Sequence, residues 1–195
     1  MKKILIGLMC LLTLMCSVGC TSDKKSVTTN KNVSTKTENT KKEVKSKCSY
    51  YECLTKMSLD NTLEDLNEIV GFEATKLENT TSSNFDKYEY DFGNDKKITV
   101  SFYNDKVSTI KLEYDKKDLK NKKVTLENLS DVKARINDGI SYEEFKKSVG
   151  NVDGTLIEVS SWNKYVWVAE DGSSNVTASF GKDGNLKFFS GLGFK

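Results

Sequence analysis

The hydrophobic and polar positions of the chain repeat one short pattern twice. Residues 57–71 (MSLDNTLEDLNEIVG) and 136–150 (INDGISYEEFKKSVG) align without a gap. In each segment a hydroxyl residue, Thr62 or Ser141, is followed by an apolar residue, an acidic pair and a closing Val-Gly. A hydroxyl N-cap, acids in the first turn and a glycine after the last turn are typical of a short helix. The repeat therefore predicts a duplicated helix-then-sheet unit.

Each copy is preceded by a second helical pattern. Apolar residues recur at intervals of three and four over residues 48–57 and again over residues 126–136, which predicts another helix before each copy. The residues that carry this spacing are Tyr50, Leu54 and Met57 in the first unit and Leu126, Leu129, Val132 and Ile136 in the second.

Strand patterns follow both helix pairs. In the first unit apolar and polar residues alternate strictly over residues 88–92, 98–102 and 110–114, which is typical of a sheet with one buried and one wet face. Residues 165–169 of the second unit are instead apolar on both faces. Turn sequences such as 93–95 and 182–184 separate neighbouring strands, which predicts antiparallel hairpins. The fold class is therefore α+β, with two tandem units, residues 48–120 and 121–195, each a helix-turn-helix packed on a four-stranded antiparallel sheet. The predicted strands span residues 73–78, 88–92, 98–102, 110–114, 155–160, 165–169, 176–180 and 186–189.

The start of the chain has the pattern of an export signal. Lys2 and Lys3 precede an apolar run over residues 4–15 that is too short to span a bilayer as a mature helix. Residues 17–20 (SVGC) resemble the lipobox of bacterial lipoproteins, although Ser17 stands where leucine is usual. The resemblance implies cleavage of residues 1–19, a lipid such as palmitate on Cys20, and a membrane-anchored protein outside the cytoplasm. An ordinary secreted protein cleaved nearby is the alternative.

A lysine-rich segment separates the predicted anchor from the predicted units. Residues 21–47 hold eight lysines and three acidic residues, with almost no aliphatic side chains, so we expect residues 20–47 to form a disordered tether. Its lysines either attract anionic lipid or wall polymer or simply keep the tether soluble. Residues 48–195 hold 20 basic and 25 acidic residues, and this acidic balance disfavours nucleic-acid binding.

The residue types in the chain limit the chemistry that it can perform. No histidine is present, which excludes Ser-His-Asp and Cys-His catalysis and histidine-ligated metals. The acidic residues fall at helix starts, turns and wet strand positions, so we expect neither an enzyme nor a cofactor or metal site. Cys48 and Cys53 permit a disulfide only if Cys48 precedes the first helix; otherwise they remain free thiols.

Aromatic residues gather in the strands of the second unit. Trp162, Tyr165, Trp167 and Phe189 are the candidate partner-binding residues, because aromatic side chains on a wet sheet face suit a protein or glycan contact. The alternative is that this face packs against the other unit or against the C-terminal residues 192–194.

The order of elements carries a resemblance to a known family. Over residues 48–195, two tandem helix-turn-helix and sheet units resemble the β-lactamase-inhibitor-protein-like (BLIP-like) fold. The resemblance implies a lipid-anchored extracytoplasmic protein that contacts an envelope protein through the sheet face of its duplicated domain, including as an inhibitor. It transfers no individual contact residue. The alternative is a binder of a wall polymer or a small envelope ligand.

Overall fold

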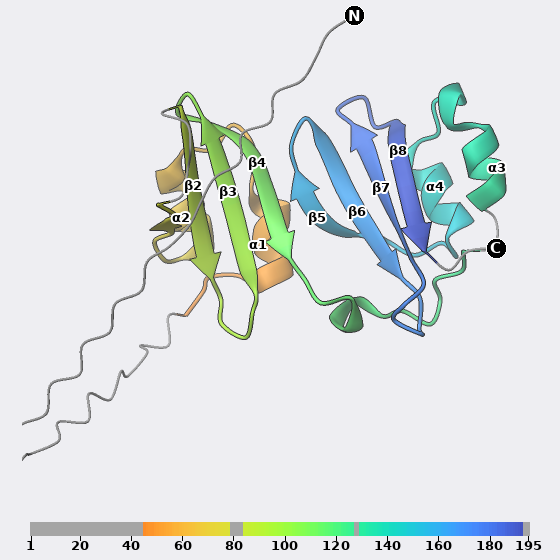
Figure 1. The fold of residues 1–195 in the computed structure, drawn as a ribbon, viewed down its shortest axis with the longest axis horizontal. Helices are drawn as coiled ribbons and strands as arrows, with labels where there is room; N and C mark the ends of the chain where they lie inside the picture. Colours follow the sequence, from red (N-terminus) through yellow and green to blue (C-terminus); the bar gives the residue numbers. More distant parts are fainter. Residues whose placement is uncertain (1–44, 79–83, 127–128, 193–195) are drawn as a thin grey trace, which may run out of the picture. The chain divides into compact units, whose positions relative to one another are not determined.

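A computed structural model describes residues 45–78, 84–126 and 129–192 of the chain (Figure 1). The predicted signal, Cys20 and nearly all of the predicted tether lie outside these residues. The described part contains no helix that is long and apolar enough to cross a membrane. Its helices are α1 (Tyr50–Lys56), α2 (Leu63–Val70), α3 (Leu129–Ala134) and α4 (Tyr142–Ser148), with the 3₁₀ turns η1 (Lys116–Leu119) and η2 (Ile136–Asp138). Its strands are β1 (Thr75–Lys76), β2 (Phe85–Asp91), β3 (Lys97–Tyr103), β4 (Lys106–Glu113), β5 (Thr155–Val159), β6 (Trp162–Val168), β7 (Asn175–Gly181) and β8 (Leu186–Leu192).

The eight strands form one antiparallel sheet in sequence order, which gives the mixed α+β class predicted from the sequence. The structure does not confirm two separate four-stranded sheets, because β4 pairs with β5 and makes the sheet continuous. This junction is short, with Ile110 opposite Val159 and Lys111 opposite Glu158. Pairing these two strands satisfies backbone groups that two separate sheets would have left at their edges.

The repeated helix is confirmed in both positions. Thr62 Oγ1 accepts a hydrogen bond from the backbone N–H of Asp65 at 3.2 Å, and the Asp65 carboxylate accepts one from the N–H of Thr62 at 2.8 Å. Ser141 and Glu144 form the same reciprocal pair at the start of α4. Each pair satisfies two N–H groups that a helix start leaves without an intrahelical partner. The two copies therefore begin in the same way.

Several element boundaries differ from the prediction. The first strand is only two residues long, Thr75–Lys76. Strand β6 begins at Trp162 rather than at residue 165, because its pairing with β7 extends to Trp162 opposite Gly181. Strand β8 continues to Leu192, opposite Asn175. Strands β6, β7 and β8 are therefore longer than predicted, whereas β5 ends one residue earlier, at Val159.

Both helical layers pack on the same face of the sheet. Ile110 pairs with Val159, Val159 with Asn163, and Asn163 with Phe180 across neighbouring strands. These residues therefore share one face of the sheet. Ile110 belongs to the core cluster beneath α1 and α2, and Phe180 belongs to the cluster beneath α4. Figure 1 shows α1 and α2 behind β2, β3 and β4. The opposite face carries no α-helix among the described elements and is called here the open face.

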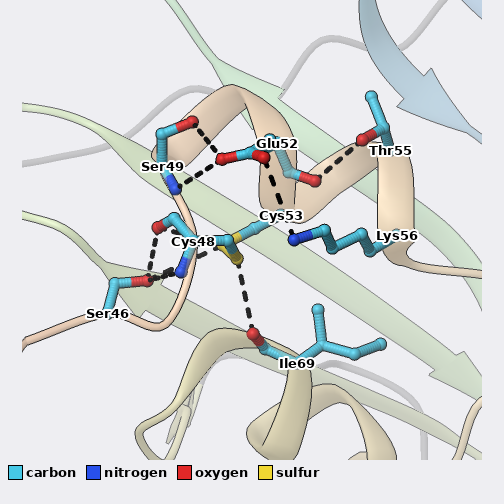
Figure 2. A network of polar contacts seen from close by, with 8 residues as sticks. All are labelled: Ser46, Cys48, Ser49, Glu52, Cys53, Thr55, Lys56 and Ile69. Carbon is cyan, nitrogen blue, oxygen red and sulfur yellow. Dashed lines mark hydrogen bonds and ion pairs between the residues drawn. A yellow bond between two sulfur atoms is a disulfide. The ribbon is translucent and has the colours of Figure 1, made fainter.

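A disulfide marks the start of the folded part. Cys48 and Cys53 are bonded, with their Cα atoms 5.5 Å apart. Cys48 precedes Ser49, the N-cap of α1, so the chain is extended where two residues five positions apart meet. Figure 2 shows the polar contacts around the bond, in which the Glu52 carboxylate accepts hydrogen bonds from the backbone and hydroxyl groups of Ser49.

The same stretch is fastened to the end of α2. The backbone N–H of Lys47 donates to the carbonyl of Val70 at 2.8 Å. The Ser46 hydroxyl lies 2.7 Å from the carbonyl oxygen of Cys48 and 2.9 Å from that of Val70. The segment before α1 is therefore held both by the disulfide and by hydrogen bonds to the neighbouring helix.

Candidate functional site

The middle of the open face is polar and carries two ion pairs. One row of residues crosses seven strands on this face: Glu89, Thr99, Lys111, Glu158, Lys164, Ser179 and Phe188. Glu89 forms an ion pair with Lys97 at 2.8 Å, and Glu158 forms one with Lys164 at 2.9 Å. Opposite charges on neighbouring strands stabilise a wet sheet face. These four residues balance one another's charge, whereas Lys111 of the same row forms no ion pair with another described residue.

Large apolar side chains are exposed at other positions of the open face. The exposed large hydrophobic residues of the described chain are between 38% and 66% accessible, and the register places every one on this face. They are Phe85, Tyr103, Trp162, Phe188 and Leu192. Phe85 and Tyr103 face each other across β2 and β3, with ring centroids 6.1 Å apart. The helix-bearing face has no exposed side chain of this kind among the described residues.

Two apolar residues of the open face are covered by the chain itself. Val166 and Val168 are buried and belong to the first core cluster, with Leu119 packed against that cluster. The backbone N–H of Asn121 donates to the carbonyl of Val168 at 3.0 Å. The segment that follows β4 therefore lies against this part of β6. These valines contribute to the core and not to an accessible binding surface.

Trp167 is not a surface residue, which corrects the sequence interpretation. Its side chain is 2% exposed and packs against Phe145 of α4, with ring centroids 5.1 Å apart. Its Nε1–H donates to the carbonyl of Val152 at 2.7 Å. Trp162 and Trp167 are five residues apart, and side chains at an odd spacing in a strand point to opposite faces. Only Trp162 of the two tryptophans is accessible to a partner.

Tyr165 and Phe189 also lie on the helix-bearing face rather than on the open face. Tyr165 is half-buried and its ring centroid lies 4.9 Å from that of Tyr142. Burial raises the pKa of Tyr165, and a hydrogen bond with the Asn163 side chain opposes this effect. Phe189 is half-buried, with its ring centroid 5.8 Å from that of Phe145. The predicted cluster of four aromatics is thus divided between the two faces.

The sequence interpretation missed four of the exposed residues, and two of them carried a readable signal. Phe102 and Tyr103 are adjacent aromatics in one strand, as are Phe188 and Phe189. Adjacent side chains point to opposite faces, so one member of each pair must leave the core. Tyr103 and Phe188 are those members. No comparable signal marks Phe85 or Leu192.

The described residues contain no group of three or more histidine, cysteine, aspartate or glutamate side chains that could hold a metal ion.

The pKa of Tyr142 is raised to about 12. Burial of the side chain is the main cause, and the hydrogen bond that the backbone N–H of Gly154 donates to the hydroxyl at 3.0 Å opposes it. This tyrosine therefore stays protonated at neutral pH.

Comparison with known proteins finds similarity to a solved structure. No protein-family model matches the chain, and a search of curated proteins finds no match. A crystal structure from Streptococcus mutans described as a "putative beta-lactamase inhibitor protein" is similar, with 13% sequence identity and a TM-score of 0.46. The similarity covers 77% of this chain and 100% of that chain.

Proposed function

We propose that the protein is a lipid-anchored extracytoplasmic binding protein that contacts an envelope protein through the open face. The observation that carries this proposal is the placement of all the exposed large hydrophobic residues of the described chain on one face of the sheet. Aromatic side chains are enriched at the energetic centres of protein interfaces. Inhibition of the partner is one consequence that such a contact would have.

The charges of the open face also suit a protein partner. Its acids Glu89 and Glu158 are paired with Lys97 and Lys164 within 3 Å, so most of the central charge is balanced and binding does not require a highly charged ligand. A partner can bury the exposed rings while its own polar groups meet the paired charges at the surface. A wall polymer of repeated charge would have to compete with these existing ion pairs.

A photo-crosslinking amino acid at Tyr103, Trp162 or Phe188 tests the proposal in cells. We expect all three positions to crosslink to the same envelope protein, because they lie on one face of the sheet. Matched controls carry the same amino acid at Glu64 and Glu143, which are exposed on α2 and α4. Crosslinks that appear equally at the helix positions, or at no open-face position, would count against an interface on the open face.

Salt dependence separates the protein partner from the alternative of a wall polymer. Exposed charges are screened over about 10 Å at 0.1 M salt and about 3 Å at 1 M. Because the proposed contact is mainly apolar, we expect the captured protein to remain bound as sodium chloride is raised across this range. A complex that dissociates steeply with salt would favour the polymer instead.

Lipid attachment at Cys20 is tested by metabolic labelling with palmitate. We expect the wild-type chain to be labelled and Cys20→Ala to lose the label and its membrane retention, because the cysteine after Gly19 is the predicted acceptor. The control is Cys16→Ala, which follows the bulky Met15 and should stay labelled. Equal labelling of the Cys20→Ala chain would refute the anchor while leaving the open-face proposal untouched.

A further inference from the structure

A hollow of about 520 Å³ lies on the helix-bearing face, on the other side of the sheet from the proposed protein contact. Its floor is built from β5, β6 and β7 by Leu156, Val159, Asn163, Tyr165 and Phe180, which the register places on one face. One wall comes from the end of α1 and the turn that follows it, residues 55 and 57–60. The volume falls within the range of about 300–1,000 Å³ that is typical of small-molecule sites. This hollow is called here the helix-side groove.

The polar groups of the groove are mostly uncharged. Its polar lining residues are Thr55, Ser58, Ser160, Ser161, Asn163 and Tyr165. The hydroxyls of Thr55 and Ser160 donate to the backbone carbonyls of Glu52 and Trp162. Asp60 and Lys182 are its charged residues, and neither forms an ion pair with another described residue. Hydroxyl and amide groups both donate and accept hydrogen bonds. The groove therefore suits a ligand that carries many groups of the same kind.

The apolar part of the groove restricts the ligand further. Met57, Leu59, Leu156 and Val159 present aliphatic surface beside the ring of Tyr165. A sugar ring offers hydroxyls at its rim and C–H groups on its faces, so it can meet both the polar and the apolar parts of this lining. A phosphate or nucleotide would require more than the single cation Lys182.

An extended peptide is a poorer fit for this position. Peptides that add to a sheet use the unpaired backbone groups of an edge strand. Strands β6 and β7 are paired on both sides along the floor, and β5 pairs with β6 and, at Glu158 and Val159, with β4. The groove thus offers mainly side chains, and only the short stretch of residues 155–157 in β5 lacks a partner in β4.

We propose that the helix-side groove is a second binding site, for a short uncharged saccharide. Asn163 and Ser161 hydrogen-bond the sugar hydroxyls, and Tyr165 with the aliphatic floor packs against a ring face. Asn163 and Ser161 are exposed. Asn163 also hydrogen-bonds the Tyr165 side chain, so a ligand reaches both residues without a rearrangement of the core. The site lies on the opposite face from Trp162, so saccharide and protein can bind at the same time.

Isothermal titration calorimetry of the full-length protein in detergent with tetra-N-acetylchitotetraose tests the proposal, and maltotetraose serves as a second probe without acetamido groups. We expect saturable binding of at least one of these oligosaccharides. Asn163→Ala should raise the dissociation constant about three- to tenfold, which corresponds to the loss of one neutral hydrogen bond. The matched control is Trp162→Ala, the neighbouring residue on the opposite face, which should leave saccharide binding unchanged.

The two proposals fail in different ways. Absence of saturable binding by both oligosaccharides overturns the saccharide site, as does equal weakening by Asn163→Ala and Trp162→Ala. Neither result affects crosslinking from the open face. Conversely, the crosslink from Tyr103 or Phe188 could be lost in the Asn163→Ala variant and kept in the Trp162→Ala variant. That result would overturn the open-face proposal and show that the groove holds the protein partner.

Discussion

Trp167→Ala is expected to lower the free energy of unfolding by about 3–5 kcal/mol, the usual effect of removing a large buried aromatic side chain. The indole packs against the rings of Phe145 and Tyr142 and donates a hydrogen bond to the carbonyl of Val152. It also lies so close to Gly154 that a Cβ atom there would be 2.5 Å from the ring. The substitution would leave both a cavity and a buried carbonyl without its donor. Urea denaturation followed by circular dichroism measures the change.

Trp162→Ala is the matched control for this experiment. Trp162 belongs to the same strand but is 49% exposed on the open face, so its removal should change stability by about 0.5 kcal/mol or less. Trp167→Phe should lower the free energy of unfolding by an amount between those of Trp162→Ala and Trp167→Ala. It keeps an aromatic ring in the core and loses only the hydrogen bond and part of the side-chain volume. Equal destabilisation by Trp162→Ala and Trp167→Ala would mean that the two tryptophans are not divided between the faces as described.

Local signals in the sequence predicted the elements well. The hydroxyl caps and closing glycine located α2, because Thr62 and Gly71 act through contacts within a few residues. The strict alternation over residues 98–102 located β3 in the same way. The joining of β4 to β5 could not be predicted, because it depends on two residue pairs separated by about fifty positions. Alternation specifies which face of a strand is buried but not which strand it pairs with.

The candidate site was harder to predict because a single bulge reverses the faces of a strand. Simple alternation from the buried Leu186 would bury Phe188 and expose Phe189. In the structure Leu186 pairs with Phe180 and Phe188 pairs with Ser179, so Lys187 is the extra residue of a bulge. An extra residue shifts every later side chain to the other face. Phe189 consequently packs on Phe145, and Phe188 becomes part of the open face.

Reduction of the Cys48–Cys53 bond is expected to lower the free energy of unfolding by about 2 kcal/mol, because the bond closes a short loop in the unfolded chain. The effect should concentrate in α1, which has seven residues and is too short to be stable alone. Cys53 and Leu54 of this helix are fully buried against the sheet, so loss of α1 would open the first core cluster. Urea denaturation with and without reductant compares identical side chains and therefore isolates the cross-link.

Cys48→Ala with Cys53→Ala controls for effects of the reductant elsewhere in the chain, since its denaturation midpoint should not respond to reductant. Peptide mapping after alkylation shows whether the wild-type pair is bonded before reduction. An unchanged wild-type midpoint, once mapping has shown the bond to be lost, would mean that the hydrogen bonds from Ser46 and Lys47 to Val70 hold this segment without it. A lowered midpoint would show that the folded part depends on a bond that only an oxidising compartment maintains, as expected for a protein outside the cytoplasm.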